Sequence, residues 1–222
     1  MWTRVGAYWQ EAMRLAWDSF LAGTVPVGCV IVDVQGEIIS RGRNAIFGSI
    51  TSSPLDGTNL AHAEMNALYQ LKRDDHPQIR QYTLYTSLEP CPMCFGAAVM
   101  MGIRQIRYGA RDAIAGSAAL RSATPYLRSK KVRVELADPS LEVFQLALVT
   151  AFELQRKHRR QAEFLALLRG DCPLGAAIGT ELFGQGYFDR ARQANYTVQQ
   201  VYDQIMDAAK KRSMNENLGG IG

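Results

Sequence analysis

The chain has 222 residues, of which 47% are hydrophobic and 21% charged, and its formal net charge is +4. These values are ordinary for globular proteins and exclude a disordered, collagen-like or coiled-coil chain. No apolar run approaches the roughly 20 residues of a membrane span, and charges interrupt the first apolar segment, so we expect neither a membrane protein nor a secretory signal. Four cysteines are too few for a disulfide framework, which favours a cytoplasmic location.

The N-terminal part of the chain begins with a helix and a hairpin. Apolar residues at helical spacing predict a helix over residues 8–22. A β-branched run and a turn then predict two antiparallel strands at 26–34 and 38–43. Residues 44–60 are rich in Gly, Ser, Pro and Asn, and loops of that length in compact domains are usually functional. A second helix is predicted over 61–72.

Strands and helices continue to alternate in the middle of the chain. Strands are predicted at 82–87, 105–110 and 131–136, with a short apolar helix at 91–101 and a long helix from about 139 to 168. This alternation indicates an α/β fold with a mixed sheet and helical layers.

The composition changes near Gly170. Five glycines fall between residues 170 and 186, and an amphipathic helix is predicted at 197–212. We therefore expect a main domain over 1–168 and a C-terminal accessory segment over 169–222, Gly-rich at first and then helical.

Two short motifs at predicted helix starts carry candidate chemistry, His62-Ala63-Glu64 and Cys91-Pro92-Met93-Cys94. Cysteines three apart lie on one helix face, and a helix N-terminus favours thiolates. Two thiolates and an imidazole suit Zn²⁺, and three protein ligands leave a position for a water whose pKa zinc lowers toward about 7. A neighbouring carboxylate, Glu64, can transfer the proton of that water. These groups would hydrolyse an amidine-like C–NH₂ bond of a heteroaromatic ring.

A structural zinc site is the alternative interpretation of the same residues. It would need a fourth protein ligand, for which the sequence offers His76, His158, Cys29 and Cys172. Glu89, beside the cysteines, is interpreted as a residue that holds the cysteine loop through its backbone.

The chain resembles the cytidine deaminase superfamily, and most of all its branch of tRNA adenosine deaminases, guanine deaminases and cytosine deaminases. The His-x-Glu and Pro-Cys-x-x-Cys signature is typical of zinc nucleobase deaminases. The resemblance runs from about residue 8 to 160. It is carried by these motifs together with Val25-Pro26-Val27-Gly28, Gly42-Arg43-Asn44, Thr86-Ser87-Leu88-Glu89-Pro90 and Tyr108-Gly109-Ala110-Arg111-Asp112.

The resemblance implies a three-layer α/β/α fold with a mixed five-stranded sheet. It implies zinc ligands His62, Cys91 and Cys94, and Glu64 as the proton shuttle. Asn44 and the backbone N–H of Ala63 are expected to face the substrate base, although Asn44 taken by itself is an ordinary turn residue.

The implied enzyme is a zinc-dependent hydrolase of C–N bonds in cyclic amidines, which releases ammonia from a nucleobase, a nucleoside or an adenosine in tRNA. Phe47 and Tyr126 are expected in loops near the mouth of the pocket, where either could stack on a base. The basic run 156–160 is either a solvated helix face or an RNA-phosphate contact. The small residues of the helix at 91–101 predict a homodimer or higher oligomer.

Three segments depart from the pattern of the family. The region after Arg111-Asp112 lacks the His-rich stretch that is common in bacterial tRNA enzymes. The loop before His62 reads Asp56-Gly57-Thr58-Asn59-Leu60-Ala61 instead of the common Asp-Pro-Thr-x, and the segment beyond about residue 165 has no counterpart. These departures leave a substrate within RNA and a free base or nucleoside as competing alternatives. A catalytically inactive subunit that binds RNA or a partner is a third alternative, and the presence of Glu64 argues against it.

Overall fold

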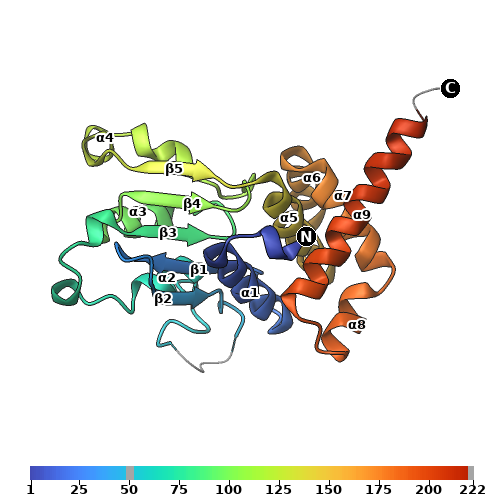
Figure 1. The fold of residues 1–222 in the computed structure, drawn as a ribbon, viewed down its shortest axis with the longest axis horizontal. Helices are drawn as coiled ribbons and strands as arrows, with labels where there is room; N and C mark the ends of the chain where they lie inside the picture. Colours follow the sequence, from blue (N-terminus) through green and yellow to red (C-terminus); the bar gives the residue numbers. More distant parts are fainter. Residues whose placement is uncertain (49–52, 220–222) are drawn as a thin grey trace.

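The computed structural model describes residues 1–48 and 53–219, so residues 49–52 of the predicted long loop lie outside the described residues. A five-stranded sheet forms one half of the molecule, and the C-terminal helices gather beside one end of it (Figure 1). Within the described residues, no helix is both long and apolar enough to cross a membrane.

The sheet is mixed, as the sequence predicts. Its strands are β1 (Gly28–Val32), β2 (Ile38–Arg43), β3 (Thr83–Thr86), β4 (Gln105–Tyr108) and β5 (Arg133–Leu136), in the order β2-β1-β3-β4-β5. Strand β1 pairs antiparallel with β2 and with β3, whereas β3, β4 and β5 are parallel. The carboxyl ends of β2, β3 and β4 therefore share one edge of the sheet, where open α/β sheets bind ligands.

Helices cover both faces of the sheet. α1 (Ala7–Leu21) lies on the face of Gly28, where an added Cβ would meet Ala12 O at 2.1 Å. α2 (Ala63–Leu68) lies on the opposite face, that of Gly42, which pairs with the neighbouring residue of β1. The fold is thus the expected three-layer α/β/α arrangement.

Shorter elements complete the main domain. α3 (Pro92–Met101) packs beside α2, and α4 (Pro125–Lys130) forms within a segment that the sequence suggested to be a loop. The described residues also form 3₁₀ turns at Trp2–Arg4, Arg73–Asp75, Ile79–Gln81 and Ala118–Ser122.

The C-terminal part is helical throughout, with α5 (Pro139–Gln155), α6 (Gln161–Asp171), α7 (Pro173–Gly184), α8 (Tyr187–Gln193) and α9 (Val198–Gly219). The expected single helix over 139–168 was therefore wrong. The chain leaves the helix at Arg156, which is extended. The Gln161 side chain donates to carbonyls at the end of α5, at 2.7 Å to those of Glu153 and Arg156 and at 3.5 Å to that of Leu154. These bonds satisfy groups that a helix end leaves unpaired.

The glycine-rich start of the accessory segment contains a helix, α7. Gly175 and Gly179 are one turn apart on α7, and added Cβ atoms there would meet Val143 O at 2.9 Å and Ala147 O at 2.5 Å. The glycines thus allow α7 to pack closely against α5. The division of the chain at 168/169 stays a prediction, and that position lies within α6.

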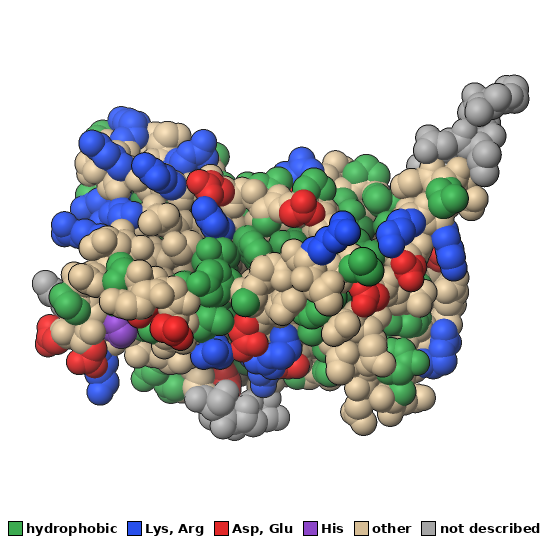
Figure 2. All heavy atoms as spheres, viewed as in Figure 1, with side chains coloured by type: hydrophobic (Ala, Val, Ile, Leu, Met, Phe, Trp, Pro, Cys, Tyr) green, Lys and Arg blue, Asp and Glu red, His purple; other side chains and the backbone are tan. Residues whose placement is uncertain are grey.

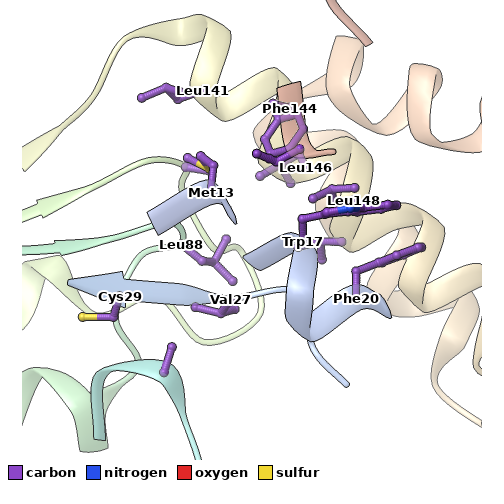
Figure 3. Packing of buried hydrophobic residues seen from close by; sticks show 14 of the residues in the cluster. Met13, Trp17, Phe20, Val27, Cys29, Leu88, Leu141, Phe144, Leu146 and Leu148 are labelled. Atoms are coloured by element: carbon purple, nitrogen blue, oxygen red, sulfur yellow. The ribbon is translucent and has the colours of Figure 1, made fainter. Parts of the chain in front are cut away.

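One large apolar cluster joins the main domain to the C-terminal helices. Trp17 and Phe20 of α1 are stacked, with ring centroids 5.3 Å apart, and lie beside Leu148 of α5 (Figure 3). The indole Nε1 of Trp17 donates to Tyr196 O, and Trp2 packs against Tyr202 of α9.

An ion pair between Arg111 and Glu142 fixes α5 to the edge of the sheet where β2, β3 and β4 have their carboxyl ends. Arg111, which follows β4, donates from Nε and Nη2 to the two carboxylate oxygens of Glu142 at 2.7 and 2.9 Å, and its Nη2 also donates to Asp171 O. The Glu142 side chain is only 8% exposed. Burial opposes its ionisation, but the hydrogen bonds and charge of Arg111 prevail, so the pKa of the Glu142 carboxyl lies below its ordinary value.

We predict that Glu142→Gln lowers the free energy of unfolding at pH 7 by about 1 to 3 kcal/mol, because it removes a charged acceptor from a bidentate pair. A lowered carboxyl pKa stabilises the fold above the unfolded-state pKa of about 4.3, and this stabilisation is lost as the pH falls through the folded-state value. The difference between wild type and variant in denaturant titrations should therefore shrink below about pH 4. Glu163→Gln, which removes an exposed ion pair with Arg160, is the control and should have little effect. A difference that is constant with pH would contradict the assignment.

Candidate functional site

His62 and Cys91 are the N-cap residues of two helices that begin at the same edge of the sheet. His62 precedes α2, Cys91 precedes α3, and Cys94 lies in the first turn of α3. The Cys91 Sγ and His62 Nδ1 atoms are 3.7 Å apart. One candidate ligand atom from each of the three residues lies within 4.8 Å of the other two.

Close backbone packing brings His62 into this position. A Cβ on Gly42 of β2 would meet Ala63 O at 2.1 Å and Ala67 N at 2.5 Å, so α2 can approach β2 only because residue 42 is glycine. Ser40 Oγ donates to Ala67 O at 2.6 Å, and Asn66 Nδ2 donates to Arg43 O at 3.0 Å. These bonds fix α2 along the strand.

The donor set fits a zinc ion. Zinc–ligand bonds of about 2.0–2.3 Å place tetrahedral ligand atoms roughly 3.3–3.8 Å apart, so the present spacing needs only small side-chain movements. In the described part of the chain, this is the one group of three His, Cys, Asp or Glu residues with suitable spacing. This group includes none of the four residues that were considered as a fourth ligand. Three protein ligands are typical of a catalytic zinc site rather than a structural one.

The protonation of the three side chains is linked. The hydrogen bond from Cys94 lowers the pKa of the Cys91 thiol to about 4 in spite of burial, with His62 contributing. The same bond, and burial, raise the pKa of Cys94. The bond to Cys91 raises the pKa of His62. The cluster thus holds negative charge on Cys91, as a metal ligand requires.

Glu64 lies beside this cluster and is almost fully enclosed, with 4% of the residue exposed. Thr86, the last residue of β3, donates from Oγ1 to Glu64 Oε1 at 3.0 Å. Burial raises the pKa of the Glu64 carboxyl. The sequence analysis included Thr86 in a motif of the family but assigned it no role, because a threonine at a strand end is common.

A cavity of about 100 Å³ connects these groups. Its walls are formed by Val25, Val27, Asn44, Ile46, His62, Glu64, Leu88, Glu89, Cys91, Asp112 and Ala115. Hydrophobic side chains form one part of the wall and titratable side chains the other, as in many small-molecule sites.

Asn44 is fixed at the cavity wall. Its Oδ1 accepts from Thr24 Oγ1 at 2.7 Å and from Ile46 N at 3.2 Å. Among the described residues, Nδ2 has no hydrogen-bond partner, so it is the group that can donate to a bound molecule. Ala63 is buried at the first position of α2, where a helix leaves its backbone N–H without an intrahelical partner.

Glu89 joins the segments that surround the cavity. Its carboxylate accepts from Ala118 N at 2.8 Å and from Asp112 N at 3.3 Å. This agrees with its interpretation as a residue that holds backbone. Asp112, which sequence reasoning did not select, also lines the cavity, and burial raises the pKa of its carboxyl.

Phe47 and Tyr126 lie in different places. Phe47 is half exposed next to Ile46, its ring stacks on that of Phe152 at a centroid distance of 6.4 Å, and the Arg156 guanidinium lies 4.1 Å from its ring centroid. Tyr126 instead lines a separate groove with Met100, at the other end of α3. Contact of either ring with substrate stays a prediction, and Tyr126 is not part of the cavity wall.

Comparisons with known proteins agree with this site. The model of the cytidine and deoxycytidylate deaminase zinc-binding region matches residues 4–110. The chain is 41% identical over 108 residues to tRNA(Ile)-lysidine synthase of Deinococcus radiodurans, covering 48% of this chain and 17% of that protein. It is 36% identical over 106 residues to tRNA-specific adenosine deaminase of Bacillus subtilis, covering 47% and 61%. The chain thus spans less than two thirds of the length of these curated relatives.

The fold agrees with a solved structure as well. Guanine deaminase from Nitrosomonas europaea superposes with a TM-score of 0.51 at 23% identity, covering 66% of this chain and 82% of that one. That protein therefore shares the fold of this one. The segment that the family model matches, residues 4–110, contains His62, Glu64, Cys91 and Cys94, and is therefore similar to the zinc-binding region of cytidine and deoxycytidylate deaminases.

Proposed function

We propose that this chain is a zinc-dependent hydrolytic deaminase of an amino-substituted purine or pyrimidine, which it converts to the oxo compound with release of ammonia. One observation carries the proposal. A buried carboxylate, Glu64, faces the same small cavity as the histidine and cysteine cluster and as Asn44. A binding subunit without activity would not need a buried carboxylate at that place.

In this proposal His62, Cys91 and Cys94 hold the zinc ion. Zinc bound there supplies a Lewis acid that lowers the pKa of a coordinated water toward about 7. The remaining chemistry belongs to side chains of the chain itself.

Glu64 moves the protons. Thr86 holds Oε1, so Oε2 is the oxygen available to take one proton from the attacking water and deliver it to the ring nitrogen. The same oxygen would then carry the second proton, from the hydroxyl group added to the ring, to the amine that departs as ammonia. Asn44 donates from Nδ2 to an acceptor on the ring, and the Ala63 N–H supplies a second donor. Val25, Val27 and Leu88 exclude water from the ring.

The finer proposal for the substrate is an adenosine within tRNA. It is supported by the 36% identity of 106 residues of this chain to a tRNA-specific adenosine deaminase. The turn between α5 and α6 also carries two exposed cations, Lys157 and Arg159. A cytoplasmic location is part of this proposal, since none of the four cysteines forms a disulfide.

We also propose that two copies associate through α3. Met93, Gly96, Ala97 and Met100 form a stripe of small and apolar residues along this helix, and Met100 is 71% exposed. An added Cβ on Gly96 would meet nothing within 4 Å, so the stripe can admit another backbone closely.

Light scattering should therefore give the mass of a dimer or higher oligomer at micromolar concentration, and Ala97→Glu/Met100→Glu should give a monomer, because it places two like charges in the interface. Met214→Glu, at an exposed methionine of α9, is the control and should leave the mass unchanged. A wild-type monomer would contradict the proposed interface.

For the metal, we expect about one zinc per purified chain, measured by mass spectrometry of the element. Cys91→Ser/Cys94→Ser should lose it, because a hydroxyl is a poor zinc ligand at neutral pH. Cys172→Ala removes a buried thiol outside the cluster and should keep the full content. Full zinc in the double variant would overturn the ligand assignment.

For the reaction, Glu64→Gln should keep zinc and fold but lower ammonia release by about 10² to 10⁴-fold, because a carboxamide cannot carry the proton. Glu163→Gln is the matched control at an exposed site and should retain wild-type turnover. The panel should include an anticodon stem-loop RNA, adenosine, guanine and cytosine, so that the reaction and the substrate are tested separately. Turnover by Glu64→Gln close to that of wild type would exclude the proposed mechanism.

A further inference from the structure

A strongly basic surface lies over α4 and the start of β5, where Lys and Arg side chains gather in one region (Figure 2). We call it the α4 basic surface, and it consists of Arg104, Arg121, Arg128, Lys130, Lys131 and Arg133. No aspartate or glutamate occurs between residues 113 and 134, a segment that supplies five of these six cations.

The positive charge of this surface is not compensated nearby. Arg121 and Arg128 donate to backbone carbonyls, those of Ala118 and Ser122. Arg107 pairs with Glu135 at the border, but within the described ranges no carboxylate pairs with the six cations. Burial and the neighbouring charge of Arg80 both lower the pKa of Arg104, which indicates that further positive charge lies close by.

Cations elsewhere on the molecule are commonly paired. Arg14 contacts Glu11 and Asp18, Arg41 contacts Glu11, and Lys210 contacts Asp207. The net charge of the chain is only +4. Unpaired positive charge is therefore concentrated on the α4 basic surface.

An exposed aromatic ring lies within the basic surface. Tyr126 is 48% exposed, and the Lys130 ammonium lies 4.3 Å from its ring centroid. Tyr126 also borders a groove that contains Arg80, Arg104 and Met100. An exposed aromatic ring among cations is typical of surfaces that bind nucleic acid, since bases stack on the ring while cations meet the phosphates.

Most of the surface is remote from the cavity, and Arg121 is the exception, because it donates to Ala118 O while Ala118 N binds Glu89 of the cavity wall. α3 begins beside Cys91 and ends at Met101 next to the groove, and its ten residues extend about 15 Å. Arg104 and Arg133 stand at the amino ends of β4 and β5, whereas Asp112 follows the carboxyl end of β4. Apart from Arg121, the α4 basic surface and the cavity therefore occupy opposite edges of the sheet.

We propose that the α4 basic surface binds the phosphate backbone of RNA at a site separate from the deaminase cavity. Four of its six cations are arginines, whose planar guanidinium groups match phosphate oxygens. α4 has only six residues, too few for an amphipathic helix that lies in a membrane. The choice of RNA among polyanions rests on the proposed function.

The test compares two variants of equal charge, both zinc-loaded. Arg128→Gln/Arg133→Gln removes two cations of the surface, and Arg4→Gln/Lys211→Gln removes two exposed cations near α9. Fluorescence anisotropy with an unmodified tRNA transcript gives Kd across a series of KCl concentrations. Melting temperature and light scattering verify that both variants keep the fold and mass of wild type.

The surface variant should raise Kd about tenfold near 100 mM KCl and reduce the slope of log K against log salt by about 1.5, because two phosphate contacts are lost. The α9 variant should match wild type, and Arg128→Lys/Arg133→Lys should retain the wild-type salt slope. Tyr126→Ala should weaken binding of a single-stranded RNA by about fivefold or more.

Equal behaviour of the two charge variants would overturn the proposal. If the surface variant lost binding to phosphatidylserine vesicles but bound RNA as wild type does, the surface would be assigned to a membrane and the proposal would be wrong. If the mass of the surface variant changed, the surface would be assigned to contact with a second copy, which would also overturn the proposal. Binding is measured without turnover. Failure of this inference is therefore distinguishable from failure of the deaminase proposal. The deaminase proposal fails if no substrate releases ammonia.

Discussion

The site depends on how closely α2 approaches β2. This helix has six residues, too few to be stable alone in water, so tertiary contacts must hold it. Gly42 leaves room for its first turn, and the bonds from Ser40 and Asn66 fix its position along the strand. His62 and Glu64 stand at the start of this helix, and therefore both are placed by the packing of a backbone against a glycine.

The segments at the same edge of the sheet shield the Glu64 carboxylate from solvent. Enclosing Glu64 costs solvation free energy, which the hydrogen bond from Thr86 offsets only in part. The surrounding segments must then be rigid enough to keep water out. Glu89 bonds the backbone after β4 at two points, and Ser117 Oγ donates to Pro90 O at 2.6 Å. Arg111 and Glu142 extend this connected frame to α5.

Sequence reasoning succeeded where a local rule fixes the geometry. His62, Cys91 and Cys94 were expected to meet because each motif opens a helix after a strand or loop, and the alternation of elements predicted the mixed sheet. Sequence reasoning failed where packing between segments distant in the chain determines the local structure. The sequence analysis noted Gly175 and Gly179 only as part of a Gly-rich segment, yet they form the helix face that contacts α5, a role visible only once α5 and α7 are in contact. Tyr126 was expected near the mouth of the pocket because it follows β4, but α4 turns it back to the far end of α3. The roles of Glu64, Asn44 and Ala63 stay predictions.

Parallel pairing of β3, β4 and β5 explains why the molecule has two chemically different edges. The carboxyl ends carry buried acids and soft metal ligands, which require the low dielectric of an enclosed cavity. Helices and turns that return the chain to the amino ends must lie outside the sheet, and α4 is such a return. Cations placed there are far enough from Glu64 for solvent to screen them, since the Debye length near physiological salt is about 8 Å. A basic surface for a polyanion can therefore coexist with a buried carboxylate in one small domain without shifting the charge balance on which the cavity depends.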